Sequence, residues 1–230
     1  MKVDYFGYKV HGKMFLAMDK DGELYGHVGT GNYNEKTAKQ YTDIHYITAE
    51  PEITSEMLNI MISLFEKKIY HAHMKDNLKI FSSPSNIRPE IIRLIELETY
   101  KGIRGRIYIK VNNLCDDEIA QLLYDAARSG VDVKILCRTS CRIMPMYNIE
   151  IRSKAGLYLE HDRIYIFGDK CFIGSADLLY RNISKRFEIM CESNYDQVFG
   201  YFMDVWNSKP IFELRDFCIW RNMIESNEKC

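Results

Sequence analysis

The sequence has no surplus of charge of either sign. Its 31 basic and 32 acidic residues leave a formal net charge of −1. Proteins that bind nucleic acid through an extended surface usually carry a basic surplus, because their affinity comes largely from phosphate contacts. The balance therefore argues against a nucleic-acid partner, but it leaves room for a local cationic pocket.

Long apolar runs and paired cysteines are also missing. No stretch of about 18 apolar residues is present to cross a membrane, and the first residues do not resemble a secretion signal. The seven cysteines are scattered and form no Cys-x-x-Cys pair. We therefore expect a soluble, cytoplasmic protein with no membrane segment, with reduced thiols and with no metal ligands among its own residues.

The chain has 230 residues, 47% of them hydrophobic, enough for one large or two small domains. Residues 106–111 and 131–137 have the composition of strands, and residues 116–129 between them have that of a helix. This βαβ pattern predicts parallel pairing of the two strands. Residues 54–68 show apolar side chains at helical spacing, with Thr54 as the expected N-cap. The sequence therefore indicates the α/β class.

One arrangement of residues occurs twice along the chain. Each copy has a histidine, a cation two positions later, a turn, and a loop of small residues that ends in a short polar side chain. The copies are His11, Lys13 and residues 29–32 (Gly-Thr-Gly-Asn), and His161, Arg163 and residues 174–177 (Gly-Ser-Ala-Asp). The turn between two extended segments predicts a β-hairpin in each copy.

Such a unit suits an anionic substrate. Alternate residues of a strand point to one face, so each histidine projects together with its cation. The cation can neutralise phosphate charge, while an imidazole nitrogen can attack phosphorus or donate a proton. Small residues in the loop let backbone N–H groups approach a phosphate. We expect the copies to meet at a pseudo-twofold axis, one histidine acting as nucleophile and the other as general acid.

The paired motif resembles that of the phospholipase D superfamily, with Arg163 and Asp177 departing from its usual lysine and asparagine. A longer resemblance, to the bacterial polyphosphate kinase family, accounts for both departures. It rests on VHGKM at 10–14, HVGTGNYNEKTA at 27–38, YTD at 41–43, LEHDRIY at 159–165 and GSAD at 174–177, in the same order as in that family.

The resemblance to polyphosphate kinases implies roles for individual residues. His11 matches the histidine that becomes phosphorylated, and His161 matches the second active-site histidine, which also lies at the nucleotide. Tyr41 and Arg138 match positions that contact ATP. The positions that match the phosphate-binding channel are Lys13, Arg163, Asn32, Lys110 and Asn112. Mg²⁺ is implied as a companion of the nucleotide, with no ligands identifiable in this chain.

The same resemblance implies the architecture and the partners. We expect phospholipase D-like mixed sheets flanked by helices, in two pseudo-repeated lobes: an incomplete first lobe at residues 1–80 and a second at 81–230. The incomplete lobe should show an unpaired strand edge and exposed apolar surface. The implied partners are ATP or ADP, polyphosphate, and either further copies of the chain or an amino-terminal chain encoded upstream.

Three functions stay open at this point. The first is a polyphosphate kinase-like phosphotransferase that moves the terminal phosphate of ATP to polyphosphate, reversibly, through a phosphohistidine. The second is an inactive or partner-dependent C-terminal fragment of a split polyphosphate kinase. The third is a metal-independent phosphodiesterase of the phospholipase D type.

Overall fold

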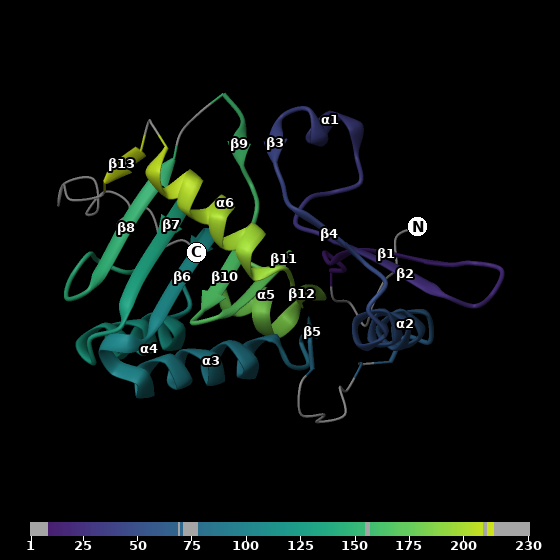
Figure 1. Cartoon of the computed structure of the whole chain (residues 1–230), viewed down its shortest axis with the longest axis horizontal. Helices are drawn as coiled ribbons and strands as arrows, with labels where there is room; N and C mark the ends of the chain where they lie inside the picture. Colours follow the sequence, from purple (N-terminus) through teal and green to yellow (C-terminus); the bar gives the residue numbers. More distant parts are fainter. Residues whose placement is uncertain (1–8, 69, 71–77, 155–156, 209–210, 214–230) are drawn as a thin grey trace.

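The computed structural model describes residues 9–68, 70, 78–154, 157–208 and 211–213. Two sheets of unequal size carry the fold (Figure 1). The first half of the chain forms a three-stranded sheet in the order β1-β2-β4, and the second half forms an eight-stranded sheet in the order β13-β8-β7-β6-β10-β11-β12-β5. The short strands β3 and β9 pair in parallel and tie the halves together.

The first half has four strands and two helices within the described residues. They are β1 (Lys13–Met18), β2 (Leu24–Gly29), α1 (Glu35–Ala38), β3 (Tyr41–Thr42), β4 (His45–Thr48) and α2 (Pro51–Phe65). β1 and β2 pair antiparallel, so the first predicted hairpin is confirmed. Helix α2 begins at Pro51, and the prediction of Thr54 as N-cap was wrong. Proline suits a first helical turn, and the Thr54 hydroxyl donates to the Glu50 carbonyl within that turn, at 3.1 Å.

The second half contains the remaining elements. They are β5 (Ile80–Ser83), α3 (Ile87–Lys101), the 3₁₀ turn η1 (Gly102–Arg104), β6 (Arg106–Leu114), α4 (Asp117–Arg128), β7 (Asp132–Cys141), β8 (Ile149–Lys154), β9 (Leu159–Glu160), β10 (Ile164–Phe167), β11 (Lys170–Gly174), α5 (Tyr180–Lys185), β12 (Glu188–Glu192), α6 (Tyr195–Asn207) and β13 (Ile211–Glu213). Strands β6 and β7 pair in parallel across α4, and β10 and β11 form the second hairpin. The predicted βαβ unit is confirmed.

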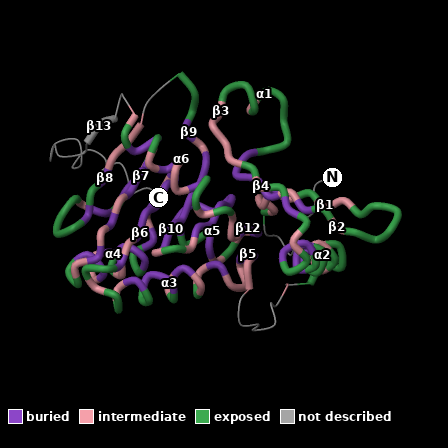
Figure 2. Tube along the Cα trace, viewed as in Figure 1, coloured by how far each residue is buried: buried purple, intermediate pink, exposed green. Residues whose placement is uncertain are grey.

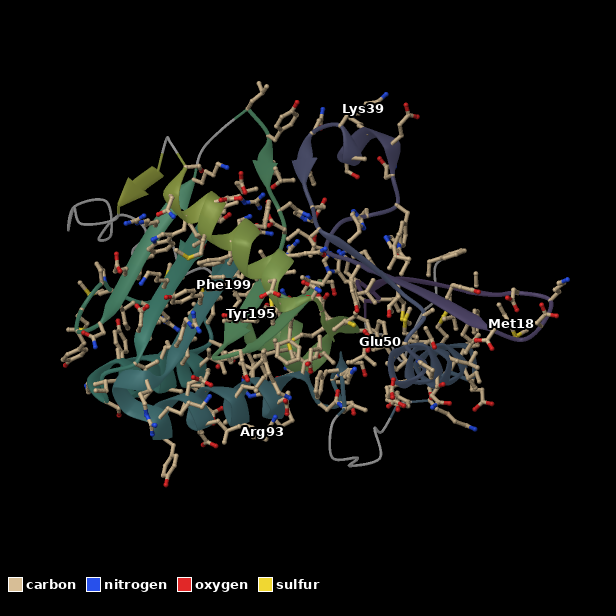
Figure 3. All side chains as sticks on the ribbon, viewed as in Figure 1. Met18, Lys39, Glu50, Arg93, Tyr195 and Phe199 are labelled. Carbon is tan, nitrogen blue, oxygen red and sulfur yellow. The ribbon has the colours of Figure 1, made fainter. Side chains whose placement is uncertain are left out.

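Helices cover both faces of the large sheet. Helices α3 and α4 enclose one apolar core with it, which includes Ile95, Leu123 and Phe172. Helix α6 lies along the opposite face, where Phe202 and Trp206 pack against Ile166. Figure 3 shows the labelled Tyr195 and Phe199 on this helix, with their rings stacked at 5.3 Å.

A third core joins the two halves. Val28 and Met57 of the first half pack in one cluster with Phe187 and Ile189 of the second. The backbone N–H of His11 also donates to the Phe187 carbonyl, at 2.8 Å. The start of β1 is therefore fixed against the second half, in the part of the fold where the two hairpins meet. Within the described residues, no helix is long and apolar enough to span a bilayer.

Candidate functional site

The two predicted histidine–cation pairs lie at equivalent places on the two hairpins. Lys13 is the first residue of β1 and pairs with Gly29 of β2. Arg163 directly precedes β10, and its carbonyl accepts the N–H of Gly174, at 3.3 Å. In both hairpins the cation therefore lies opposite the glycine that opens the small-residue loop.

Each imidazole is held in the same way. Nδ1 of His11 donates to Oε2 of Glu188 at 2.9 Å, and Nζ of Lys13 donates to Nε2 of His11 at 2.9 Å. Nδ1 of His161 donates to Oδ1 of Asp43 at 2.9 Å, and Nη1 of Arg163 donates to Nε2 of His161 at 3.1 Å. The carboxylates place the proton on Nδ1 of each ring and leave Nε2 unprotonated. Nη1 of Arg163 bonds Nε2 of His161, whereas Nζ of Lys13 lies beside both nitrogens of His11, 3.1 Å from Nδ1 as well as 2.9 Å from Nε2.

The carboxylates come from the opposite halves of the molecule. His11 of the first half is held by Glu188 at the start of β12, and His161 of the second half by Asp43 before β4. Each histidine can be oriented only when both halves are in place. The two halves therefore form one site.

A loop hydroxyl completes each arrangement. Thr30 donates to the same Asp43 oxygen that His161 uses, at 2.7 Å, and Ser175 donates to the same Glu188 oxygen that His11 uses, at 2.5 Å. Both hydroxyls accept a backbone N–H from the residue that follows the carboxylate, at 3.0 Å for Thr30 and 3.1 Å for Ser175. Gly31 gives this loop room, because a Cβ there would overlap the Asp43 carboxylate.

Burial and the closely spaced charges of the site shift the pKa values of its groups. Burial and the neighbouring Arg163 lower the pKa of Lys13 to about 8, although Glu188 opposes the shift. Burial also lowers the pKa of His161, and the charges of Arg163 and Lys13 act in the same direction, so the neutral ring is favoured. Burial by itself raises the pKa of Asp43, but hydrogen bonds from His161 and Thr30 outweigh it and hold that pKa below its usual range.

An open cavity of about 440 Å³ lies in front of the first copy. Its lining includes His11, Lys13 and Asn32, together with Lys9 and Tyr33. Arg163 lies deeper, where its Nε donates to Oδ1 of Asp177 at 3.2 Å. The cavity therefore gives an anion access to His11 beside a buried ammonium group.

Comparison with known proteins decides the family. Residues 2–69 match the family model described as Polyphosphate kinase C-terminal domain 1, and residues 80–208 match Polyphosphate kinase C-terminal domain 2. The polyphosphate kinase of Salmonella typhimurium is 39% identical over 198 residues, and that of Mycolicibacterium gilvum is 34% identical over 215. The chain belongs to the polyphosphate kinase family.

The match covers most of this chain but a minor part of its relatives. It takes in 80% of this chain and 28% of the Salmonella protein, and 88% of this chain and 29% of the Mycolicibacterium protein. The crystal structure of the polyphosphate kinase from Porphyromonas gingivalis superposes with a TM-score of 0.76 at 24% identity, covering 97% of this chain and 40% of that one. The phospholipase D-like α/β fold expected from the sequence is confirmed.

The predicted nucleotide contacts of the polyphosphate kinase motif lie beside His161. The ring of Tyr41 lies 4.9 Å from the His161 ring, with 43° between their planes. Nη1 of Arg138 donates to the Glu160 carbonyl at 3.0 Å, and burial together with Arg163 lowers the pKa of Arg138. The structure thus brings Tyr41, Arg138 and His161 together at the junction of β3 and β9.

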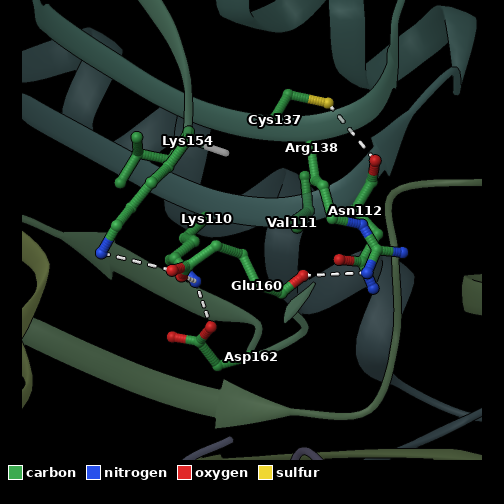
Figure 4. A pocket seen from close by; sticks show the side chains of 9 residues that line it. Lys110, Val111, Asn112, Cys137, Arg138, Lys154, Glu160 and Asp162 are labelled. Carbon is green, nitrogen blue, oxygen red and sulfur yellow. Dashed lines mark hydrogen bonds and ion pairs between the residues drawn. The ribbon is translucent and has the colours of Figure 1, made fainter. Parts of the chain in front are cut away.

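Lys110 and Asn112 lie beneath the site and do not line the cavity at His11. Lys110 is buried and paired with Asp162 and with Glu160, the latter at 2.8 Å, as Figure 4 shows. The backbone N–H of Asn112 donates to Oδ1 of Asp177 at 2.9 Å. These contacts support the segment that carries His161 and Arg163, and their role as phosphate ligands stays a prediction.

Asp43 and Glu188 were not predicted from the sequence to be functional residues. One signal could have found them: Asp43 follows Thr30 by 13 residues, and Glu188 follows Ser175 by 13 residues. The repeat therefore extends beyond the loops to a carboxylate in each copy.

The site offers few free donors for a metal ion. Among residues 9–68, 70, 78–154, 157–208 and 211–213, no group of three or more His, Cys, Asp or Glu side chains could hold a metal ion. The carboxylates nearest the histidines are already bonded to imidazoles and hydroxyls.

Proposed function

We propose that the site transfers phosphoryl groups in the manner of a polyphosphate kinase, with His11 as the nucleophile. One observation carries the proposal: Nδ1 of His11 is bonded to Glu188, so Nε2 is the unprotonated nitrogen of a ring that lines the open cavity beside Lys13. Nε2 attacks the terminal phosphorus of ATP, a P–Nε2 bond forms, and the bond from phosphorus to the bridging oxygen of ADP breaks. ADP leaves with the electron pair on that oxygen.

The cations supply the stabilisation that this step needs. Phosphoryl transfer is catalysed mainly by positioning and by neutralising charge on the phosphate oxygens. Lys13 and Arg163 are both buried, so their charges act in a medium of low dielectric constant. Mg²⁺ would enter bound to the nucleotide phosphates and offset their charge there. Tyr41 and Arg138 are the groups proposed to hold the nucleotide.

His161 serves the second step. The sequence motif led us to expect a general acid here, but the lowered pKa of His161 favours the neutral ring, whose Nε2 can accept a proton and so act as a base. We assign it to deprotonate the terminal phosphate of the acceptor polyphosphate. An oxygen of that phosphate then attacks the phosphorus on His11, the P–N bond breaks, and the chain is one phosphate longer. The reverse sequence regenerates ATP.

Labelling with γ-³²P-ATP and Mg²⁺ tests the proposal. We expect a protein-bound label that is stable in alkali and labile in acid, absent from His11→Ala and present in Lys20→Ala, whose side chain lies exposed at the hairpin turn. The assay is run on residues 1–230 alone and with the preceding region of the Salmonella relative added. A label that survives in His11→Ala, or no label under either condition, would refute the mechanism. Metal-independent cleavage of a phosphodiester would instead favour the phospholipase D reaction.

A further inference from the structure

The carboxylate that holds His11 uses only one of its two oxygens. Oε2 of Glu188 accepts from Nδ1 of His11 at 2.9 Å and from the hydroxyl of Ser175 at 2.5 Å. Oε1 of Glu188 is buried and accepts no hydrogen bond from any residue that the structure describes. The whole side chain is inaccessible to bulk solvent. An unbonded oxygen on a buried, ionised carboxylate is costly, and folded proteins satisfy nearly all such atoms.

Two further buried side chains beside Glu188 have an unbonded polar atom. Ser83 of β5 pairs directly with Glu188 of β12, so the two side chains lie on the same face of the sheet. Ser83 is completely buried, and its Oγ has no partner within the described part of the chain. Helix α5 packs against β5, and its Ile183 shares a core with Phe81, which lies on the same face as Ser83.

Asn182 on α5 is the third of these side chains. It is 3% exposed, and its Oδ1 accepts nothing from the residues described. Ser83, Asn182 and Glu188 thus supply half of the six buried side-chain atoms that lack a partner among the described residues. The unmet hydrogen bonds are therefore concentrated where β5, α5 and β12 meet, directly behind the carboxylate of His11.

The carboxylate of the other histidine is placed differently. The side chain of Asp43 is 11% exposed, so water can reach it. The small sheet ends at β4, which follows Asp43, whereas β5 extends the large sheet beyond β12 and covers Glu188. Figure 2 shows this difference: β10 and β12 are buried, while the hairpin of β1 and β2 is exposed over much of its length. Glu188 can therefore be solvated only from within the protein.

The three unbonded atoms match the bonding capacity of one water molecule. Oε1 of Glu188 and Oδ1 of Asn182 can only accept hydrogen bonds, whereas the Ser83 hydroxyl can donate one. A water that donates to both oxygens and accepts from Ser83 leaves none of the three unbonded. Buried waters typically make about three hydrogen bonds of this kind to groups that the protein itself does not satisfy.

We propose that an internal water binds between Ser83, Asn182 and Glu188 and completes the support of His11. Ser83 and Asn182 are then positioning residues for the nucleophile. The water keeps Glu188 ionised and its Oε2 directed at the ring, which keeps the proton on Nδ1 of His11. The consequence for phosphoryl transfer rests on the proposed function, but the water and the position of the proton belong to the resting protein.

A crystal structure of residues 1–230 that resolves ordered water tests the site itself. We expect one buried water within hydrogen-bond distance of Oγ of Ser83, Oδ1 of Asn182 and Oε1 of Glu188. The inference is overturned if the density shows these atoms bonded to one another, bonded to a different part of the chain, or without any partner.

The tautomer of His11 tests the positioning role without any assay of activity. Nitrogen-15 NMR of the imidazole reports which nitrogen carries the proton. We expect Nδ1–H in the wild type and in Ser82→Ala, and a mixture of both tautomers in Ser83→Ala. Ser82 is the matched control, because it is 2% exposed on the same strand but pairs with Ile189, on the opposite face. An unchanged tautomer in Ser83→Ala would overturn the role.

Urea unfolding and labelling complete the test. Removing a hydroxyl that has no partner relieves a cost, whereas removing one that is bonded to water loses an interaction. Ser83→Ala should therefore lower the urea midpoint, and a raised midpoint would contradict the inference. Label formation should slow about tenfold in Ser83→Ala, toward the lower end of the loss seen when an outer hydrogen-bond partner is removed at metal sites. Ser82→Ala should label normally, and equal rates in the two variants would refute the positioning role. A wild-type chain that forms no label would refute the proposed function instead, and the water and the tautomer would still decide this inference.

Discussion

The two halves of this protein place their histidines identically within very different surroundings. His161 belongs to a hairpin in the middle of a sheet that helices cover on both faces, whereas His11 belongs to a hairpin at the edge of a small sheet with one helix. Both rings nevertheless have a carboxylate of the opposite half at Nδ1 and a cation within 3.1 Å of Nε2. The comparison teaches that each hairpin, together with a carboxylate from the opposite half, is enough to define the site. The helices and strands packed around each hairpin instead determine its stability and the surface it offers to partners.

Replacing each histidine in turn should have the largest effect and should distinguish the two halves most clearly. His11→Ala removes the proposed nucleophile, and we expect phosphate transfer to fall at least about 10⁴-fold, with no covalent label. His161→Ala removes only a proton acceptor, so the label should still form while transfer to polyphosphate falls about 10²–10⁴-fold. Single-turnover labelling and product formation, measured separately, distinguish the two variants. Equal loss of label in both would mean that the two rings do not divide the reaction in this way.

The next largest loss of activity is expected from replacing Glu188 and Asp43, the carboxylates that reach across to the histidine of the opposite half. Glu188→Gln and Asp43→Asn keep the size of the side chain but no longer fix the Nδ1 proton by an anionic acceptor. Loss of a comparable carboxylate from a catalytic histidine costs about 10⁴-fold, and we expect about 10³-fold here. Glu188→Gln should impair formation of the label, and Asp43→Asn should impair its transfer, as the crossed contacts require. The opposite assignment, measured in the same single-turnover assays, would show that each carboxylate serves its own half.

Aromatic residues on the two hairpins should differ in how much they contribute to stability. Phe172→Ala empties a site that is 0% exposed, and it should cost about 3–5 kcal/mol in the free energy of unfolding. Phe15, on the outer face of the small sheet, is 58% exposed, so Phe15→Ala should cost less than about 1 kcal/mol. Urea unfolding of the two variants of residues 1–230 measures both values. A large cost at Phe15 would show that its face is covered in the isolated chain.

The sequence could foresee the parts of the site that depend on neighbouring residues. A histidine and a cation two positions apart on a strand must share a face, and the strand–helix–strand order beginning at Arg106 favours a parallel pair, as β6 and β7 show. The contact between Asp43 and His161 joins residues 118 apart, and no local pattern specifies it. Lys110 shows the same limit, because its carboxylate partners lie at Glu160 and Asp162, far along the chain.

The two cations should differ in their response to pH. The pKa of Lys13 is lowered to about 8, so its charge is present below that pH and is lost as the pH rises through it. A guanidinium group, by contrast, is always charged in proteins. For the free enzyme, kcat/KM for ATP should therefore fall about tenfold for each pH unit above 8. Lys13→Arg should move this descending limb to higher pH, while Lys20→Arg should leave it in place. A limb unchanged by Lys13→Arg would assign it to another group.

Removing the loop hydroxyls of Thr30 and Ser175 should have the smallest effect on activity, and it compares the two carboxylates directly. Thr30→Val and Ser175→Ala each remove one hydrogen bond to a carboxylate that still holds its imidazole. Loss of an outer hydrogen-bond partner costs about 10–100-fold in activity at metal sites, and we expect losses toward the lower end of that range here. Glu188 is completely buried, whereas the Asp43 side chain is 11% exposed and water can replace the lost donor there. Ser175→Ala should therefore slow label formation more than Thr30→Val slows label transfer, in single-turnover measurements. If the two losses were equal, burial would not distinguish the two carboxylates, and the halves would be equivalent in energy as well as in geometry.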